Sequence, residues 1–236
     1  MIERLVAIGC SFTQGTHGAT WANHLDISRV VNLANEGAGN SYICRCTLNY
    51  LESHNHNPKK TLVIVMWSGP SRIDVSVSSE WYKHIKTTFK FGQSDGVSNW
   101  IHTGSSGNVP VLESLCKTND NQSLCVDSLQ NFILLENYLR AQGYSYLFTS
   151  YANYWHEDQE YCATTEVDPN IGYHCKNISL YQHFDFSNWV FINNKRDCFG
   201  EFALDDIHNR DDAHPSPDTH RRFATEILLP AIRKFQ

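Results

Sequence analysis

Three separated segments of the sequence carry residue types that together could hydrolyse an ester. The first, residues 9–15 (GCSFTQG), follows a predicted strand and places a serine between two glycines. A serine hydroxyl is a weak nucleophile until a base activates it, and a histidine held by a carboxylate is the usual base. Residues 211–216 (DDAHPS), near the other end of the chain, contain both of these groups. We therefore expect Ser11 to be the nucleophile, His214 its base and Asp211 the carboxylate that orients His214.

The third segment, residues 32–40 (NLANEGAGN), could supply backbone N–H groups to a developing oxyanion. Each segment also has a plainer interpretation when taken alone. The first could be only a tight strand-to-helix turn, the second a solvated acidic loop with a capping histidine, and the third a flexible loop.

The elements that must position these segments alternate along the chain. Apolar runs predict strands, and apolar residues at helical spacing predict helices. The run TLVIVMW lacks alternation, as expected of a strand that is buried on both faces. Strands are expected at residues 4–8, 29–33, 61–67 and 146–150, and helices at residues 21–27, 41–51, 127–141 and 217–234. This order predicts a parallel sheet with helices on both faces.

Two long stretches interrupt the alternation. Residues 75–122 are rich in Ser, Gly, Asn and aromatic residues, and residues 152–196 are rich in Tyr, Trp, His and Asn. Both are too long for simple connections. We interpret them as insertions above the sheet, within a single domain that spans residues 1–236.

The composition limits the classes of function. The 236 residues are 41% hydrophobic and 19% charged, which is typical of one globular domain. The net charge of −6 argues against a nucleic-acid-binding protein. The N-terminal apolar run is too short for a signal sequence, and no apolar segment reaches the roughly 18 residues of a membrane helix. These features predict a cytoplasmic protein with no membrane insertion and mostly reduced cysteines, with a virion-associated protein as the alternative.

Taken together, the three segments resemble the conserved blocks of the SGNH (GDSL-like) hydrolase family. GCSFTQG is similar to the first block, with Cys10 in place of the usual Asp. NLANEG is similar to the second block, and DDAHPSPDTH to the fifth. The resemblance implies that Ser11, His214 and Asp211 form a catalytic triad. It also implies that the N–H groups of Ser11 and Gly37 form the oxyanion hole.

One block of the family pattern is missing. After the third strand the family has G-x-N-D, whereas this chain has residues 67–72 (WSGPSR), which contain no Asn. Ser68 or Ser71 could substitute as an oxyanion donor, and Ser68 is the one that we include in the expected site. The pattern WS-x-x-x-R resembles a divergent branch of the family met in phage and environmental sequences.

The resemblance implies a three-layer α/β/α sandwich with a mostly parallel, flavodoxin-like sheet of five strands. The expected activity is ester hydrolysis through an acyl-enzyme, on a small acyl ester or an O-acetylated glycan, with no metal or organic cofactor. The alternative is a catalytically weak or inactive protein on the same scaffold that binds glycans or serves a structural role. The sequence does not specify the oligomeric state.

Overall fold

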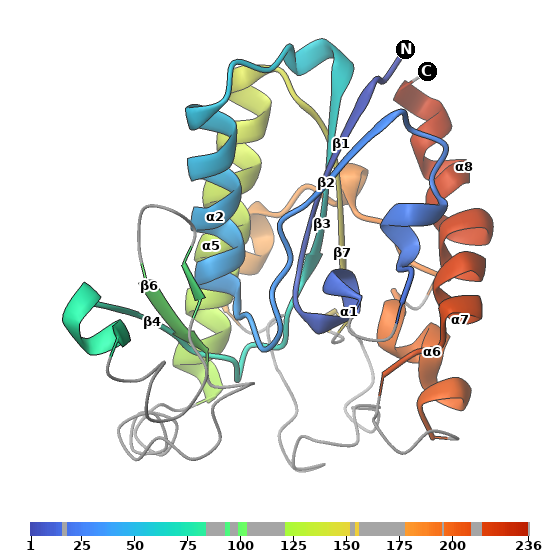
Figure 1. Cartoon of the computed structure of the whole chain (residues 1–236). Coiled ribbons are helices and arrows are strands. Elements are labelled where there is room, and N and C mark those ends of the chain that lie inside the picture. The colour runs from blue at the N-terminus through green and yellow to red at the C-terminus, as the bar shows by residue number, and fades with distance from the viewer. Residues whose placement is uncertain are drawn as a thin grey trace.

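The fold is a three-layer sandwich in which helices cover both faces of a central parallel sheet (Figure 1). The computed structural model describes residues 1–15, 18–83, 93–94, 99–102, 121–151, 154–155, 178–194, 196–208 and 214–235. The strands are β1 (Arg4–Ile8), β2 (Arg29–Asn32), β3 (Thr61–Trp67), β4 (Asp74–Val77), β5 (Gln93–Ser94), β6 (Asn99–His102) and β7 (Ser145–Ser150). The α-helices are α1 (Ser11–Gln14), α2 (Asn40–Ser53), α5 (Asn121–Gln142), α6 (Phe199–His208), α7 (Pro217–Arg222) and α8 (Leu229–Ile232).

The central sheet has the strand order β2-β1-β3-β7, and all its pairs are parallel. All seven residues of β3 are buried, as the unbroken apolar run predicts. Next to β7 the expected fifth strand is reduced to one parallel bridge between Phe148 and Trp189. The main-chain N–H of Val190 donates to the carbonyl of Phe148 at 2.7 Å there. The described strands thus keep the flavodoxin-like order that the sequence predicts, with four strands and this single bridge.

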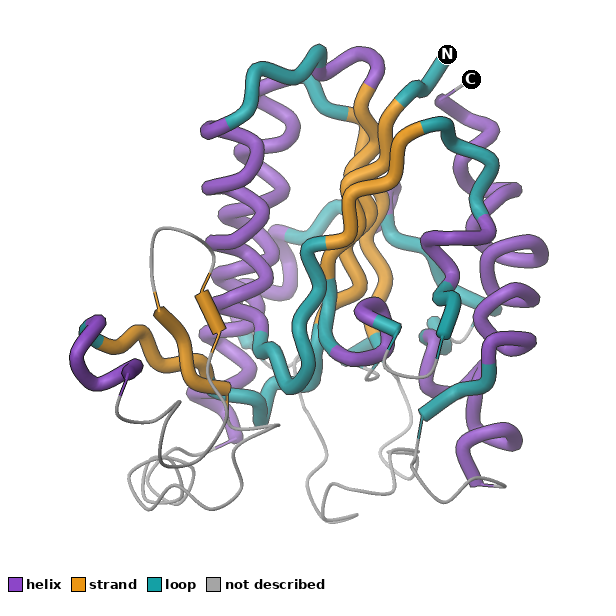
Figure 2. Tube along the Cα trace, viewed as in Figure 1, coloured by secondary structure: helices purple, strands orange, loops and turns teal. Residues whose placement is uncertain are grey.

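Helices α2 and α5 cover one face of the sheet, and α1, α6, α7 and α8 lie on the other (Figures 1 and 2). The predicted closing helix consists of α7, a π-helical turn (Phe223–Leu228), α8 and a final 3₁₀ turn (Arg233–Phe235). Pro230 follows the π-helical turn and has no N–H with which to continue the regular hydrogen-bond ladder. The segment expected to form a short helix at residues 21–27 is a 3₁₀ turn, Trp21–His24.

An aromatic cluster fills the core between α5 and the sheet. The Phe132 ring is fully buried, and its centroid lies 4.4 Å from the Trp67 ring and 5.6 Å from the Trp189 ring. Trp155 is 2% exposed and packs edge-on against Trp189 at 4.9 Å. The two tryptophans of the second insertion therefore belong to the core.

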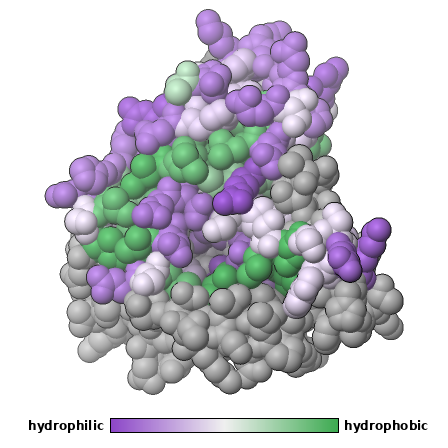
Figure 3. All heavy atoms as spheres, turned by 90° about the vertical axis from the view of Figure 1, so that its left-hand side faces the viewer, coloured by the Kyte–Doolittle hydropathy of each residue, from purple (hydrophilic) through white to green (hydrophobic). Residues whose placement is uncertain are grey.

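The first insertion contributes a small separate sheet of order β4-β6-β5, in which neighbouring strands are antiparallel. It lies beside α2 at the end of the molecule where the central strands end (Figures 1 and 2). The side that carries α2 and α5 exposes hydrophobic residues between hydrophilic ones (Figure 3). Leu134 on α5 is 54% exposed. Among the described helices, none combines the length and the apolar composition needed to cross a bilayer.

Two residues of α5 test how far the aromatic cluster supports the fold. We expect Phe132→Ala to lower the free energy of unfolding by about 3–5 kcal/mol, because it removes a large ring from a closed core. Leu134→Ala on the exposed side of the same helix should change it by less than about 0.5 kcal/mol. Urea denaturation followed by circular dichroism measures both variants. Equal losses from the two substitutions would contradict the assignment of Phe132 to the core.

Candidate active site

Ser11 begins α1 immediately after β1, at the carboxyl end of the sheet. Open α/β sheets bind their ligands at this edge. The turn between strand and helix is very tight, because a Cβ atom on Gly9 would lie 2.4 Å from Thr13 Oγ1 and 2.8 Å from the Met66 carbonyl oxygen. The side chain of Asn32, at the end of β2, donates to the Thr13 carbonyl at 2.6 Å. Ser11 is 4% exposed, so the turn holds its side chain almost out of contact with bulk solvent.

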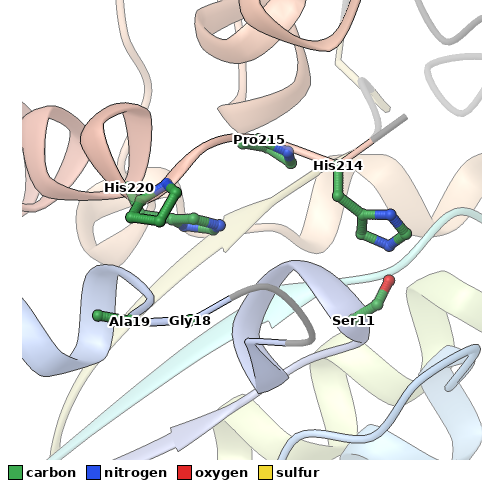
Figure 4. Close-up of a pocket in the computed structure, with 7 residues that line it drawn as sticks. Ser11, Gly18, Ala19, His214, Pro215 and His220 are labelled. Atoms are coloured by element: carbon green, nitrogen blue, oxygen red, sulfur yellow. The ribbon is translucent and has the colours of Figure 1, made fainter. Parts of the chain in front are cut away.

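His214 reaches Ser11 from the opposite end of the chain. The two residues line one pocket, and Figure 4 shows the Ser11 hydroxyl pointing toward the His214 imidazole. The pocket is small, with room for about one water molecule. Its other lining residues are Gly18, Ala19, Pro215, Pro217 and His220.

The segment that carries His214 is anchored from both sides. The main-chain N–H of Ser216 donates to Asp206 Oδ2 at 2.5 Å, which ties the segment to α6. The Ser216 hydroxyl accepts from the N–H of Thr219 at 3.3 Å and so caps α7. On the side of the nucleophile, the His214 ring lies 5.4 Å from the ring of Phe12. Asp211, the expected orienting carboxylate, lies outside the described residues.

Gly37 is buried in the loop between β2 and α2, and this loop is attached to the serine turn. The N–H of Asn35 donates to the Gly9 carbonyl at 3.1 Å. Among the described residues, none accepts a hydrogen bond from the N–H of Gly37 or from the N–H of Ser11. An oxyanion hole requires N–H groups that have no other acceptor, but Gly37 does not line the pocket that Ser11 and His214 share.

Ser68 is fully buried where β3 ends, and Asn40 of α2 holds its main chain. The N–H of Ser68 donates to Asn40 Oδ1 at 2.9 Å, and its carbonyl accepts from Asn40 Nδ2 at 3.2 Å and from the Tyr154 hydroxyl. The Ser68 side chain lies near the hydroxyl of Tyr151, and burial raises the pKa of that hydroxyl. Ser68 does not line the pocket that Ser11 and His214 share.

Several of the groups that shape the site could not be recognised from the sequence. Asp206 and Tyr151 stand in segments without a motif, and their roles depend on tertiary contacts. The Tyr151 ring stacks on Phe12 at 4.9 Å, and the Arg72 guanidinium lies 4.8 Å from the centre of the Tyr151 ring. Asn40 belongs to the glycine-rich segment, but nothing in that segment predicts its link to Ser68. Within the described part of the chain, no three His, Cys, Asp or Glu side chains are grouped so that they could hold a metal ion.

Comparison with protein families decides the classification. A model of a family of unknown function, DUF6071, matches residues 12–228. The chain belongs to DUF6071. No protein with curated annotation matches this DUF6071 sequence.

Two solved structures resemble this DUF6071 protein over nearly its whole length. The lipase Lip_vut3 from a goat rumen metagenome has a TM-score of 0.52 at 14% identity, over 98% of this chain and 97% of the lipase. An acylhydrolase candidate, BF3764 from Bacteroides fragilis, has a TM-score of 0.50 at 13% identity, over 99% of this chain and 88% of that protein. At this identity the likeness shows the fold alone. It confirms the predicted three-layer SGNH hydrolase fold for the DUF6071 chain.

His220, at the back of the pocket, gives this DUF6071 protein a testable pH dependence. The residue is 5% exposed, and burial, together with a smaller effect of the nearby His24, lowers its pKa to about 4. The unfolded chain binds this proton near pH 6.5 and the folded chain only near pH 4, so stability is lost as the pH falls through that window. We expect His220 to make the protein about 2 kcal/mol less stable at pH 5 than at pH 7.

The measurement is urea denaturation at pH 7 and pH 5 for the wild type and for His220→Gln. His220→Gln should lose less stability on acidification than the wild type by about that amount. His183→Gln, at an exposed position, is the matched control and should behave as the wild type does. The same pH dependence in His220→Gln and the wild type would contradict a buried neutral imidazole.

Proposed function

We propose that the protein is a serine hydrolase that cleaves carboxylic esters through an acyl-enzyme. The observation that carries the proposal is the pocket in which the Ser11 hydroxyl points toward the His214 imidazole (Figure 4). These two residues come from opposite ends of the chain. A shared pocket at the carboxyl end of the sheet is the arrangement that nucleophile and base require.

In the proposed reaction the Ser11 hydroxyl attacks the ester carbonyl. His214 accepts the serine proton and passes it to the leaving alcohol, and water then hydrolyses the acyl-enzyme by the same route in reverse. Asp211 orients His214. The N–H groups of Ser11 and Gly37 stabilise the oxyanion, and their lack of acceptors among the described residues supports this role.

The proposed substrate carries a small acyl group, such as an O-acetyl group on a glycan. The pocket is small, and its lining of Gly18, Ala19 and two prolines favours a short acyl group over a long one. The polar composition of the two insertions favours a glycan as the leaving alcohol. A series of p-nitrophenyl esters of increasing acyl length tests the size limit, and the rate should fall steeply beyond the shortest members.

One observation favours a second candidate, a protein on the same scaffold that binds glycans or has a structural role without catalysis. Residues 68–70 (SGP) offer no amide side chain where the related hydrolases have an Asn. Losing such a donor typically costs about 10²–10³ in rate. A fluorophosphonate probe separates the candidates, because it labels an activated serine and spares an unactivated one.

Substitutions at the proposed triad should act as a unit. We expect Ser11→Ala and His214→Ala each to lower kcat for p-nitrophenyl acetate by about 10⁴-fold or more, and the double variant to be little worse. Asp211→Ala should cost less, because a packed His214 can still act as a base. Ser28→Ala, at a position that precedes β2 and lies far from the pocket, is the matched control and should retain full activity. Wild-type activity in Ser11→Ala, with circular dichroism showing an intact fold, would overturn the proposal.

The role of Ser68 has its own test. Ser68→Ala should lower kcat by about 10-fold if the hydroxyl helps to hold the oxyanion. An unchanged kcat would remove Ser68 from the oxyanion hole and leave Ser11 and Gly37 as its donors.

A further inference from the structure

The loop that carries Gly37 is held at its far end by a carboxylate from the small antiparallel sheet. Asp74, the first residue of β4, accepts a hydrogen bond from the N–H of Gly39 at 2.8 Å and from the N–H of Tyr42 at 2.7 Å. Gly39 is the N-cap of α2 and has no side chain with which to cap the helix. Asp74, which lies on β4, therefore caps α2 in place of the side chain that an N-cap residue normally provides.

The contact between the loop and Asp74 leaves no spare space. A Cβ atom on Gly39 would lie 2.3 Å from the Arg72 carbonyl oxygen and 2.8 Å from Asp74 Oδ2. At the other end of the loop, the N–H of Asn35 is bound to the Gly9 carbonyl. Gly37 lies between these two anchors, two residues from Gly39. The position of its N–H thus depends on where Asp74 holds the end of the loop.

Asp74 is itself held by His102, its directly paired residue on β6. His102 Nδ1 lies 2.7 Å from Asp74 Oδ1, and the side chains are 1% and 0% exposed. Because both Asp74 oxygens accept main-chain N–H groups, His102 Nδ1 is the donor in this contact. The Asp74 carboxylate thus receives three hydrogen bonds, two from the start of α2 and one from the insertion.

Aromatic packing joins the same two parts of the molecule. The Tyr42 ring lies edge-on to the His102 ring at 4.7 Å and to the Trp100 ring at 5.9 Å. Trp100 is 2% exposed, and the Arg45 guanidinium of α2 lies 5.5 Å from its ring centre. The small sheet therefore rests on the first turns of α2, next to the loop that carries Gly37.

We propose that Asp74 is a positioning residue for the oxyanion loop, and that the first insertion supports catalysis through the Asp74–His102 pair. This inference rests on the proposed ester hydrolysis. Oxyanion stabilisation depends steeply on geometry, and a misplacement of about 1 Å can cost 10²-fold in rate. Through its buried carboxylate, Asp74 links the loop that carries Gly37 to β4, which is distant in sequence.

The test compares two buried carboxylates. Asp74→Asn places an amide NH₂ against N–H donors, and we expect kcat for p-nitrophenyl acetate to fall about 10- to 100-fold with KM nearly unchanged. The rate of Ser11 labelling by a fluorophosphonate should fall in parallel. Glu136→Gln is the matched control, because Glu136 is 5% exposed and bound to the Tyr146 hydroxyl near the other end of the sheet. It should keep the kcat and labelling rate of the wild type.

The outcomes distinguish this inference from the proposed function. If the wild type is neither active nor labelled, the hydrolase proposal fails and the inference fails with it. If the wild type is active and Asp74→Asn keeps its kcat and labelling rate per folded molecule, the inference alone is overturned.

If Asp74→Asn does not fold, a second pair of variants at His102 tests the same role of the Asp74–His102 pair. His102→Asn retains an N–H donor close to the place of Nδ1, and kcat should stay within about 3-fold of wild type. His102→Leu removes the donor, and kcat should fall about 10-fold. Equal kcat values per folded molecule in the two variants would also overturn the inference.

Discussion

The parallel pairing of β1 with β3 is the interaction on which the rest of the candidate site depends. It brings the ends of both strands to one edge, where Gly9 packs so closely against the Met66 carbonyl that no larger residue fits. The chain must therefore turn sharply after β1, and the turn starts α1 with Ser11 at its first position. The serine thus follows a strand whose last four residues are buried, and this strand cannot shift without disturbing the core.

Two further segments are brought to that serine, and each is held by a carboxylate. Asp206 on α6 holds the segment of His214 through the N–H of Ser216, and Asp74 on β4 holds the glycine-rich loop through the N–H of Gly39. In both cases a side chain binds the main chain of a loop within a few residues of the group that would act. The candidate site thus combines a rigid serine with two loops whose positions depend on long-range hydrogen bonds.

Much of this arrangement could be predicted from the sequence, because it follows from local patterns. The unbroken run of β3, the glycines around Ser11 and the order of strands and helices predict a parallel sheet with Ser11 at its carboxyl end. The motif resemblance predicts that His214 lies near Ser11. In the structure the two residues line one pocket. The links made by Asp74, His102 and Asn40 could not be predicted, because they join segments distant in sequence and depend on the antiparallel pairing of the small sheet. The bridge at Trp189 escaped prediction for a similar reason, since a strand reduced to one pair has no periodicity.

Identifying the residue that a fluorophosphonate modifies tests whether Ser11 is the nucleophile. The wild-type protein would be treated with the probe, digested and mapped by mass spectrometry, with His214→Ala treated in parallel. We expect one adduct, on the peptide that contains Ser11, which forms far more slowly when His214 is replaced. No adduct, or an adduct on another serine with Ser11 unmodified, would contradict it.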